Sequence, residues 1–252
     1  MNNGLELSGK VAIVTGGARN IGRAIGIELA NAGAKVMVNA NTSIKEAEET
    51  VCLIKAAGGE AAYFVADITC PESVKALVGE VIKRWGRIDL LVSNAATRQE
   101  TALADISIEE WHRVLSVVLD GAFLCTQACV PHMKTVGGGS IVTIGGMTGH
   151  RGGRNRSHVI TAKAGLVGFV KALATELAAD QITVNCVVPG TIATQRGIVG
   201  APLRPKERDH TPPLGRHGEP SEVAAMVRML CGPGARYVTG QAIHINGGGW
   251  MP

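Results

Sequence analysis

Short runs of aliphatic and β-branched residues alternate with longer stretches of helical period along this chain. The runs that we expect to be strands cover residues 11–14, 35–39, 61–66, 88–92, 140–144, 182–187 and 242–245. Between them, apolar residues recur at intervals typical of amphipathic helices, as Ile21, Ile25 and Leu29 do. Strands that alternate with helices are typical of βαβ units and a parallel sheet, and right-handed crossovers then put the helices on both faces of that sheet. The sequence therefore predicts an α/β fold, a doubly wound parallel sheet of seven strands with helices on both faces.

No linker, low-complexity tract or repeat interrupts the 252 residues, so the sequence predicts a single domain over 1–252. Aromatic residues make up only 3% of the chain, and aliphatic side chains must therefore fill its interior, as suits parallel strands buried on both faces. The first residues lack an apolar signal core, and we expect no apolar run long enough to span a bilayer. We therefore expect a cytoplasmic protein with no membrane partner.

The charges and cysteines exclude further classes of protein. The formal net charge is +4, with acidic and basic residues mixed along most of the chain, which gives no reason to expect nucleic acid as a partner. The six cysteines form no Cys-x-x-Cys pair and mostly lie inside apolar runs. We therefore expect reduced core thiols and no metal site.

A glycine-rich turn at residues 15–22 follows the first expected strand and precedes the first expected helix. Glycines at 16, 17 and 22 let the backbone turn tightly, approach a phosphate closely and present the amides of the helix N-terminus to it. The turn therefore predicts a site for the pyrophosphate of a nicotinamide dinucleotide. Because ligands of such sheets gather at the carboxyl ends of the strands, we expect the rest of the site there.

From Leu7 to Gly249 the chain resembles the short-chain dehydrogenase/reductase family. The turn is similar to the family's glycine motif, although Asn20 stands where a glycine is usual. Asp67-Ile68 resembles the family's adenine-contacting pair, residues 93–96 resemble its Asn-Asn-Ala-Gly segment, and the segment that begins at Pro189-Gly190 resembles its nicotinamide loop. The resemblance implies a Rossmann-type fold and a nicotinamide cofactor. The residues expected at that cofactor are Gly16, Arg19, Asn20, Ile21, Gly22, Asn41, Asp67, Ile68, Asn94, Ala95, Lys163, Pro189, Gly190, Ile192 and Thr194.

The end of the second strand bears on the choice between NADP(H) and NAD(H). Residues 39–43 offer no carboxylate to hold a ribose diol, so a 2′-phosphate is not repelled. Arg19 lies in the glycine turn, where family members selective for NADP often place a basic residue, and it can pair with that phosphate as a planar fork. We favour NADP(H), with NAD(H) as the alternative.

The family's catalytic residues are mostly missing. By the resemblance, Lys163 matches the lysine of the family's Tyr-x-x-x-Lys motif, but Val159 stands at the tyrosine position. The serine position falls on Gly146 and the asparagine position on Val118. Because the only tyrosines, at 63 and 237, lie in distant segments, the resemblance is to a divergent member of the family that lacks the usual phenolic proton donor.

Replacement donors and a site for an anion are expected in the basic loop 149–158. His150 and His158 titrate near neutrality and are candidate proton donors, although packing or surface roles are open for both. No Asp or Glu occurs between Asp120 and Glu176, so the arginines of this loop either bind an anion or form a solvated basic surface. The residues expected at the substrate are Gly146, Arg151, Arg154, Val159 and Arg196, the last in a substrate lid at about 191–219.

Three functions remain open. The first is an NADP(H)-dependent oxidoreductase with non-standard proton delivery, acting on a small, anionic carbonyl, imine or activated alkene. The second is a non-redox enzyme on the same scaffold, such as a lyase, isomerase or hydrolase. The third is a catalytically silent nucleotide-binding subunit. The resemblance also implies a homotetramer or homodimer.

Overall fold

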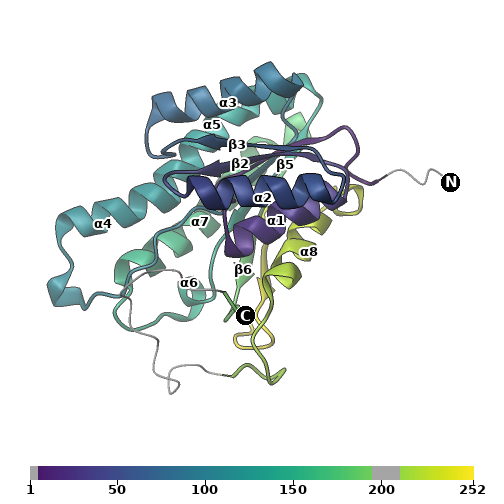
Figure 1. The fold of residues 1–252 in the computed structure, drawn as a ribbon. Coiled ribbons are helices and arrows are strands. Elements are labelled where there is room, and N and C mark those ends of the chain that lie inside the picture. Colours follow the sequence, from purple (N-terminus) through teal and green to yellow (C-terminus); the bar gives the residue numbers. More distant parts are fainter. Residues whose placement is uncertain (1–4, 195–210) are drawn as a thin grey trace.

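The structure, a computed structural model, describes residues 5–194 and 211–252 and contains a seven-stranded parallel sheet with the strand order β3-β2-β1-β4-β5-β6-β7 (Figure 1). This confirms the predicted Rossmann-type sheet, and the strand order reverses between β1 and β4. The strands are β1 (Val11–Val14), β2 (Lys35–Ala40), β3 (Ala61–Val65), β4 (Leu90–Ser93), β5 (Gly139–Ile144), β6 (Ile182–Pro189) and β7 (Ala242–Ile245).

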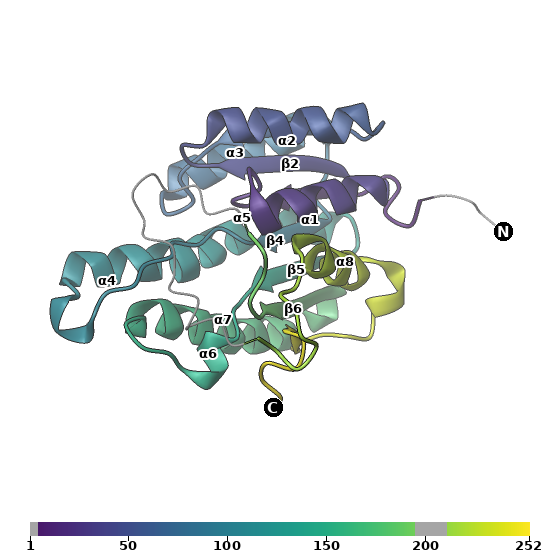
Figure 2. The same ribbon diagram turned by 60° about the horizontal axis from the view of Figure 1, so that its bottom comes forward.

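Helices cover both faces of the sheet (Figures 1 and 2). Those on one face are α1 (Asn20–Asn31), α2 (Ile44–Ala56) and α8 (Pro220–Cys231). Those on the other are α3 (Pro71–Trp85), α5 (Gly121–Thr135) and α7 (Ser157–Glu176). The remaining two are α4 (Ile108–Leu115) and the short α6 (Thr148–Arg151).

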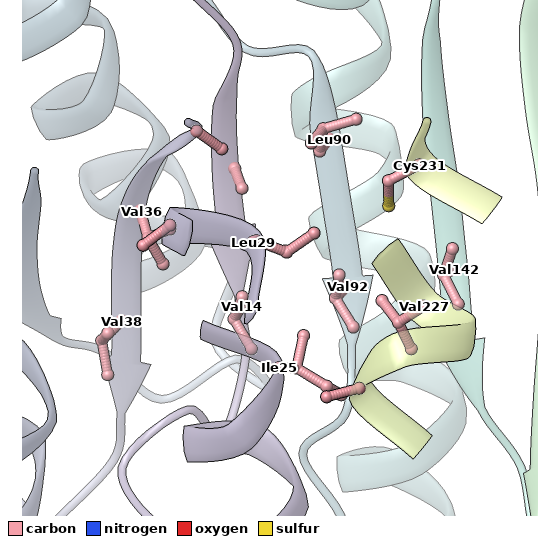
Figure 3. Packing of buried hydrophobic residues seen from close by; sticks show 14 of the residues in the cluster. Val14, Ile25, Leu29, Val36, Val38, Leu90, Val92, Val142, Val227 and Cys231 are labelled. Carbon is pink, nitrogen blue, oxygen red and sulfur yellow. The ribbon is translucent and has the colours of Figure 1, made fainter. Parts of the chain in front are cut away.

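Side chains of each strand alternate between two cores. In β1, Val14 packs into the cluster under α1 and α8 (Figure 3), whereas Ile13 packs into the cluster under α3, α5 and α7. Each fully buried aliphatic side chain of this size contributes about 1.5–3 kcal/mol relative to an exposed one. Burial on both faces therefore explains why β1 is apolar without interruption. All six cysteines are free, four of them buried, while Cys52 and Cys70 are exposed.

α4 continues into α5 through a π-helical segment, Ser116–Asp120. The whole span, Ile108–Thr135, is long and apolar enough to cross a membrane by length and composition, which our expectation from the sequence overlooked. Its residues Cys125, Cys129 and Met133 are buried in the core cluster against the sheet. Packing within the domain therefore accounts for part of its apolar character.

Asp89, just before β4, is a buried carboxylate at the amino end of the sheet. It accepts hydrogen bonds from Lys10 Nζ at 2.9 Å, from Arg87 Nε and Nη2 at 2.8 and 2.7 Å, and from the backbone N–H of Val11 at 3.0 Å. Burial acts to raise the pKa of Asp89, but the hydrogen bonds from Arg87, Lys10 and Val11 outweigh it and hold the pKa below its usual value. This carboxylate ties the start of β1 to the start of β4.

Asp89→Asn is expected to lower the free energy of unfolding at pH 7 by about 2 kcal/mol, because the amide keeps the shape but loses two charged partners. A carboxylate whose folded pKa is depressed stabilises the fold above its unfolded pKa, and this stability is lost as pH falls through the folded pKa. The variant should therefore lose less stability than the native chain on acidification. Urea unfolding at several pH values measures both effects. Asp105→Asn, at an exposed aspartate, is the matched control, and equal losses in the two variants would contradict the assignment.

Candidate active site

The glycine turn between β1 and α1 requires its glycines for two different reasons. Gly16 has φ +60°, and a Cβ there would lie 2.9 Å from Ala95 Cα. A Cβ at Gly22 would lie 2.2 Å from the carbonyl oxygen of Gly16. Asn20 has φ +51°, a left-handed conformation that asparagine tolerates better than most residues. Asn20 can therefore adopt a backbone conformation that glycine adopts readily.

Asn94, at the end of β4, holds this turn in place. Its Nδ2 donates to the carbonyl oxygens of Thr15 and Gly16, both at 3.0 Å. In return, the hydroxyl of Thr15 accepts from the backbone N–H groups of Asn94 at 3.0 Å and Ala95 at 3.2 Å. The structure therefore places the predicted residues Gly16, Asn94 and Ala95 together at the point where the strand order reverses.

The N-terminus of α1 is open to an anion. Arg19 is the N-cap residue, its side chain makes no capping hydrogen bond, and the first turn contains no acidic residue. The N–H groups of a first turn have no partner within the helix, and together with the helix dipole they favour a phosphate. The Arg19 guanidinium is half exposed and lies 3.8 Å from Glu46 of α2, measured from Nη1 to Oε1. The arrangement fits the pyrophosphate of a dinucleotide.

Two residues that were not predicted from the sequence, Arg23 and Thr50, hold the glycine turn through the carbonyl oxygen of Ala18, and we call this contact the clamp. The carbonyl oxygen of Ala18 accepts from Arg23 Nε at 3.1 Å, Arg23 Nη2 at 3.0 Å and Thr50 Oγ1 at 2.9 Å. Arg23 Nε also lies 3.0 Å from Thr50 Oγ1, and Thr50 is fully buried. No local motif signals this contact, because Thr50 comes from α2 and Arg23 from α1.

The predicted adenine and nicotinamide residues also lie at the carboxyl ends of the strands. Asp67 Oδ1 accepts from Thr69 N at 2.9 Å and Thr69 Oγ1 at 2.8 Å, and neither hydrogen bond uses Oδ2. After β6, Pro189 O accepts from Met147 N at 2.9 Å. A Cβ at Gly190 would lie 2.7 Å from Asn246 Cβ, so this position has no space for a side chain. Ile192 forms an isolated parallel bridge with Gly218, and Thr194 is the last described residue before the gap.

Lys163 of α7 reaches the end of β5, where its Nζ donates to Ile144 O at 2.5 Å. Val159 lies one turn earlier on α7 and is 9% exposed. A Cβ at Gly146 would have Lys163 Cγ, at 4.0 Å, as its nearest neighbour, so there is open space beside the lysine stem. Val118, in the π-helical segment, packs in one small cluster with Ala162, the residue before Lys163. Among Lys163, Val159, Gly146 and Val118, Lys163 is therefore the residue with an ionisable side chain.

Burial lowers the pKa of the Lys163 ammonium to about 8. The Cys186 thiol of β6 acts to raise it, and the cation of Arg98, in the loop after β4, acts to lower it further. Burial in turn raises the pKa of Cys186, which keeps this side chain a neutral thiol. The sequence analysis missed Arg98 and Cys186, because neither belongs to a recognisable motif.

The two histidines proposed as donors have partners of their own. His158 is fully buried, and its Nε2 lies 3.0 Å from Glu110 Oε1 on α4. The ring of His150 packs against those of His244, at 4.6 Å between centroids, and Trp250, at 5.1 Å. Burial lowers the pKa of His150, and the positive charge of Lys171 lowers it further. The partners of the two rings are therefore Glu110 for His158, and His244 and Trp250 for His150.

The two tyrosines have other environments. The hydroxyl of Tyr63, on β3, donates to Glu48 Oε1 of α2 at 2.8 Å, and Tyr237 is fully exposed. Tyr63 is therefore engaged with α2, and Tyr237 faces solvent.

The basic loop lines a cavity of about 400 Å³ at the start of α7. Its lining residues are Leu103, Gly153, Arg154, Asn155, Arg156 and Ser157. Arg156 forms an ion pair with Glu100, so one cation of the loop has a counter-ion from the loop after β4. Arg151 and Arg154 are exposed, and Arg196 lies outside the described residues.

Comparisons with known proteins agree with this arrangement. A family model described as Enoyl-(Acyl carrier protein) reductase matches residues 16–249. The chain is 38% identical over 243 residues to a 3-oxoacyl-[acyl-carrier-protein] reductase of a Synechocystis strain, a match that covers 96% of this chain and 97% of the relative. It is 36% identical over 242 residues to the 3-oxoacyl-[acyl-carrier-protein] reductase FabG of Staphylococcus aureus strain Mu50, covering 96% and 98%.

Solved structures share the fold over almost the whole chain. The acetoin dehydrogenase YohF of Salmonella typhimurium superposes with a TM-score of 0.86 at 35% identity, covering 95% of each chain. A short-chain type dehydrogenase/reductase of Mycobacterium marinum gives a TM-score of 0.89 at 35% identity, covering 98% of each chain. The similarity therefore extends from the glycine turn through the loop after β6 to β7.

Thr50→Val removes the hydroxyl that joins Ala18, Arg23 and α2 while keeping the volume of the side chain. We expect the free energy of unfolding to fall by about 1–2 kcal/mol and the binding of a dinucleotide to weaken by up to about tenfold, equivalent to about 1.4 kcal/mol. Urea unfolding and fluorescence titration with NADPH measure the two effects. The control is Thr175→Val, which removes an exposed hydroxyl bonded to Lys171 O at 3.1 Å. Unchanged NADPH binding by the Thr50 variant would show that the clamp does not support the site.

Proposed function

This chain belongs to the short-chain dehydrogenase/reductase family, and we propose that it is an NADP(H)-dependent oxidoreductase with a non-standard catalytic group. The observation that carries the proposal is the intact glycine turn, with its open helix N-terminus, combined with a half-buried Lys163 beside Gly146 and one turn from Val159. The glycine turn would bind a dinucleotide. At the family's serine, tyrosine and asparagine positions stand Gly146, Val159 and Val118, whose side chains carry no transferable proton.

The preference for NADP(H) rests on Arg19. The exposed side chains of Arg19 and Glu46 form a long contact, and exposed pairs of this kind contribute little, so Arg19 is available to a 2′-phosphate. Asn41, just after β2, is exposed and uncharged. A guanidinium binds a phosphate through parallel N–H donors, which makes it a better partner than a single ammonium.

The substrate that we propose is a small carbonyl compound, imine or activated alkene with an anionic group. Two relatives are named for reducing a 3-oxoacyl group, which contains a ketone. The cavity at the start of α7 supports an anion, because Arg154 lines it and the first turn of α7 contains no acidic residue. Gly146 and Val159 would leave space for the reacting group next to Lys163, and the exposed Arg151 would add positive charge. Arg196, which lies outside the described residues, is proposed as a substrate residue from the sequence alone.

The bound cofactor supplies the hydride, and the chain supplies orientation and charge. The α1 N-terminus and Gly16 would hold the pyrophosphate, and Asp67 the adenine. Ile192 and Thr194, after Pro189 and Gly190, would hold the nicotinamide end, while Lys163 would donate to the ribose hydroxyls. We assign His158 and His150 to packing, because their contacts are with Glu110 and with His244 and Trp250.

The direct test is a titration of the purified protein with NADPH and NADH, followed by nicotinamide absorbance with acetoacetyl-coenzyme A, small oxo acids and enoyl thioesters as probes. The proposal expects binding of NADPH and its oxidation by at least one carbonyl or enoyl probe. Binding without turnover would favour the silent subunit. Conversion of a probe without oxidation of NADPH would favour the non-redox enzyme. Binding of neither nucleotide would exclude the proposed function.

Arg19→Gln separates the two cofactors. We expect it to raise the Kd for NADPH by about 10–100-fold, because a charge-assisted contact with phosphate is worth about 1.5–3 kcal/mol. The Kd for NADH should stay within about twofold, since NADH lacks the 2′-phosphate. Arg84→Gln, which removes the exposed ion pair with Glu80, is the control. A loss of affinity equal for both cofactors would contradict the role given to Arg19.

A homotetramer or homodimer is the assembly that we propose. α5 exposes Phe123, and α7 exposes the small residues Ala164, Gly168 and Ala172, which would let helices of two copies approach closely. Sedimentation velocity measures the assembly, with Phe123→Glu as the variant expected to shift it towards smaller species. A native chain that sediments as a monomer over a range of micromolar concentrations would exclude it.

A further inference from the structure

We propose that the ammonium group of Lys163 itself donates the proton that the substrate takes up on reduction, in addition to binding the cofactor. This inference rests on the proposed function and deepens it, because it names the donor that the missing tyrosine leaves open. In the family pattern the lysine acts beside a tyrosine. Here the same lysine would act alone.

The first argument is position. The Lys163 stem passes Gly146, whose missing side chain leaves open space, and its Nζ lies at the carboxyl end of β5. Val159, one turn away on α7, contributes only an apolar wall. A substrate group that occupies the space left by a serine and a tyrosine would therefore meet the lysine directly.

The second argument is the number of donors. An ammonium carries three N–H groups, and one of them is directed to Ile144 O. Two remain, so one can bind a ribose hydroxyl while the other points to a substrate oxygen or nitrogen. A single side chain can therefore hold the cofactor and donate the proton.

The third argument is electrostatic. Burial brings the pKa of Lys163 to about 8, and the two titratable groups that act on it are Arg98, from the loop after β4, and Cys186, from β6. A general acid is most effective when its pKa lies near the working pH. At neutral pH Lys163 is still mostly protonated, yet it gives up its proton far more readily than a solvated lysine.

The step balances with a carbonyl substrate. The carbonyl carbon receives a hydride from the reduced cofactor, and the electron pair of the C=O π bond moves to the oxygen. The oxygen then forms an O–H bond with a proton from Lys163 Nζ, whose N–H bond breaks. Lys163 is left as a neutral amine and regains a proton from water.

Other donors near Lys163 are less suitable. The thiol of Cys186 is fully buried, and burial raises its pKa. Arginine does not lose its proton in proteins, so Arg98 can orient an anion but cannot act as the acid. The contacts of His158 and His150 direct them to Glu110 and to His244 and Trp250.

The activity test compares native protein with Lys163→Arg, which keeps the positive charge and the N–H donors but removes the transferable proton. With NADPH and whichever probe the native protein reduces, kcat is expected to fall by about 10²–10⁴-fold, the usual contribution of general acid catalysis. The Kd for NADPH is expected to change by less than about tenfold, because the charge at the ribose is kept. A variant with kcat within threefold of the native value would overturn the proposal. Lys171→Arg, at an exposed lysine on the same helix, is the matched control.

The pH profile and a direct titration complete the test. The native kcat is expected to decline above about pH 8, as the ammonium form is lost, and to fall about tenfold per further pH unit. Independently of activity, the ¹⁵N shift of Lys163 Nζ, assigned with the Lys163→Arg variant, should titrate near pH 8. A Lys163 midpoint above 10 overturns the inference.

Failure of the proposed function and failure of the role given to Lys163 would give different results. If the native protein binds NADPH but reduces no probe, the proposed function fails. If the native protein reduces a probe and Lys163→Arg does so equally well, only the role of Lys163 fails.

Discussion

The close approach of the glycine turn to the end of β4 is the contact on which the rest of the site depends. Gly16 faces the backbone of Ala95, and Asn94 binds the carbonyl groups of Thr15 and Gly16. These bonds fix the direction in which the chain enters α1. The open N–H groups of that helix therefore point to the crevice where the strand order reverses, which is where ligands bind in doubly wound sheets.

Burial acts differently on the two charged groups at opposite ends of the strands. At the amino end, Asp89 gains hydrogen bonds from Lys10, Arg87 and Val11, so its charge is stabilised although it is buried. At the carboxyl end, Lys163 gains a carbonyl oxygen but also faces the cation of Arg98, and its charged form is disfavoured. The first arrangement supports the fold, and the second lowers the pKa of the group that we propose as the proton donor. Burial in a low dielectric is common to both groups, so the different outcomes come from their different partners.

Most of the fold could be predicted because its signals are local. The expected strands match the observed ones within about two residues, and differences of two residues occur at the start of β4 and at the end of β6. The apolar character of Ile108–Thr135 was underestimated, since α4 and α5 continue through a π-helical segment into one long span. The clamp of Arg23 and Thr50 and the neighbourhood of Arg98 and Lys163 could not be predicted. Each joins segments that are distant along the chain.

The sequence by itself determined the sheet and the glycine turn, and it carries the expectation that Gly146, Val159 and Val118 stand at the family's catalytic positions, because periodicity, glycine spacing and residue identity are properties of short segments. Only the tertiary structure decided which ionisable groups surround the reacting space. His158 is directed to Glu110 and His150 to Trp250, whereas Lys163 is buried beside Gly146. The physical reason is that burial and partners set the proton affinity of a side chain, and both are supplied by elements that meet only when the chain folds.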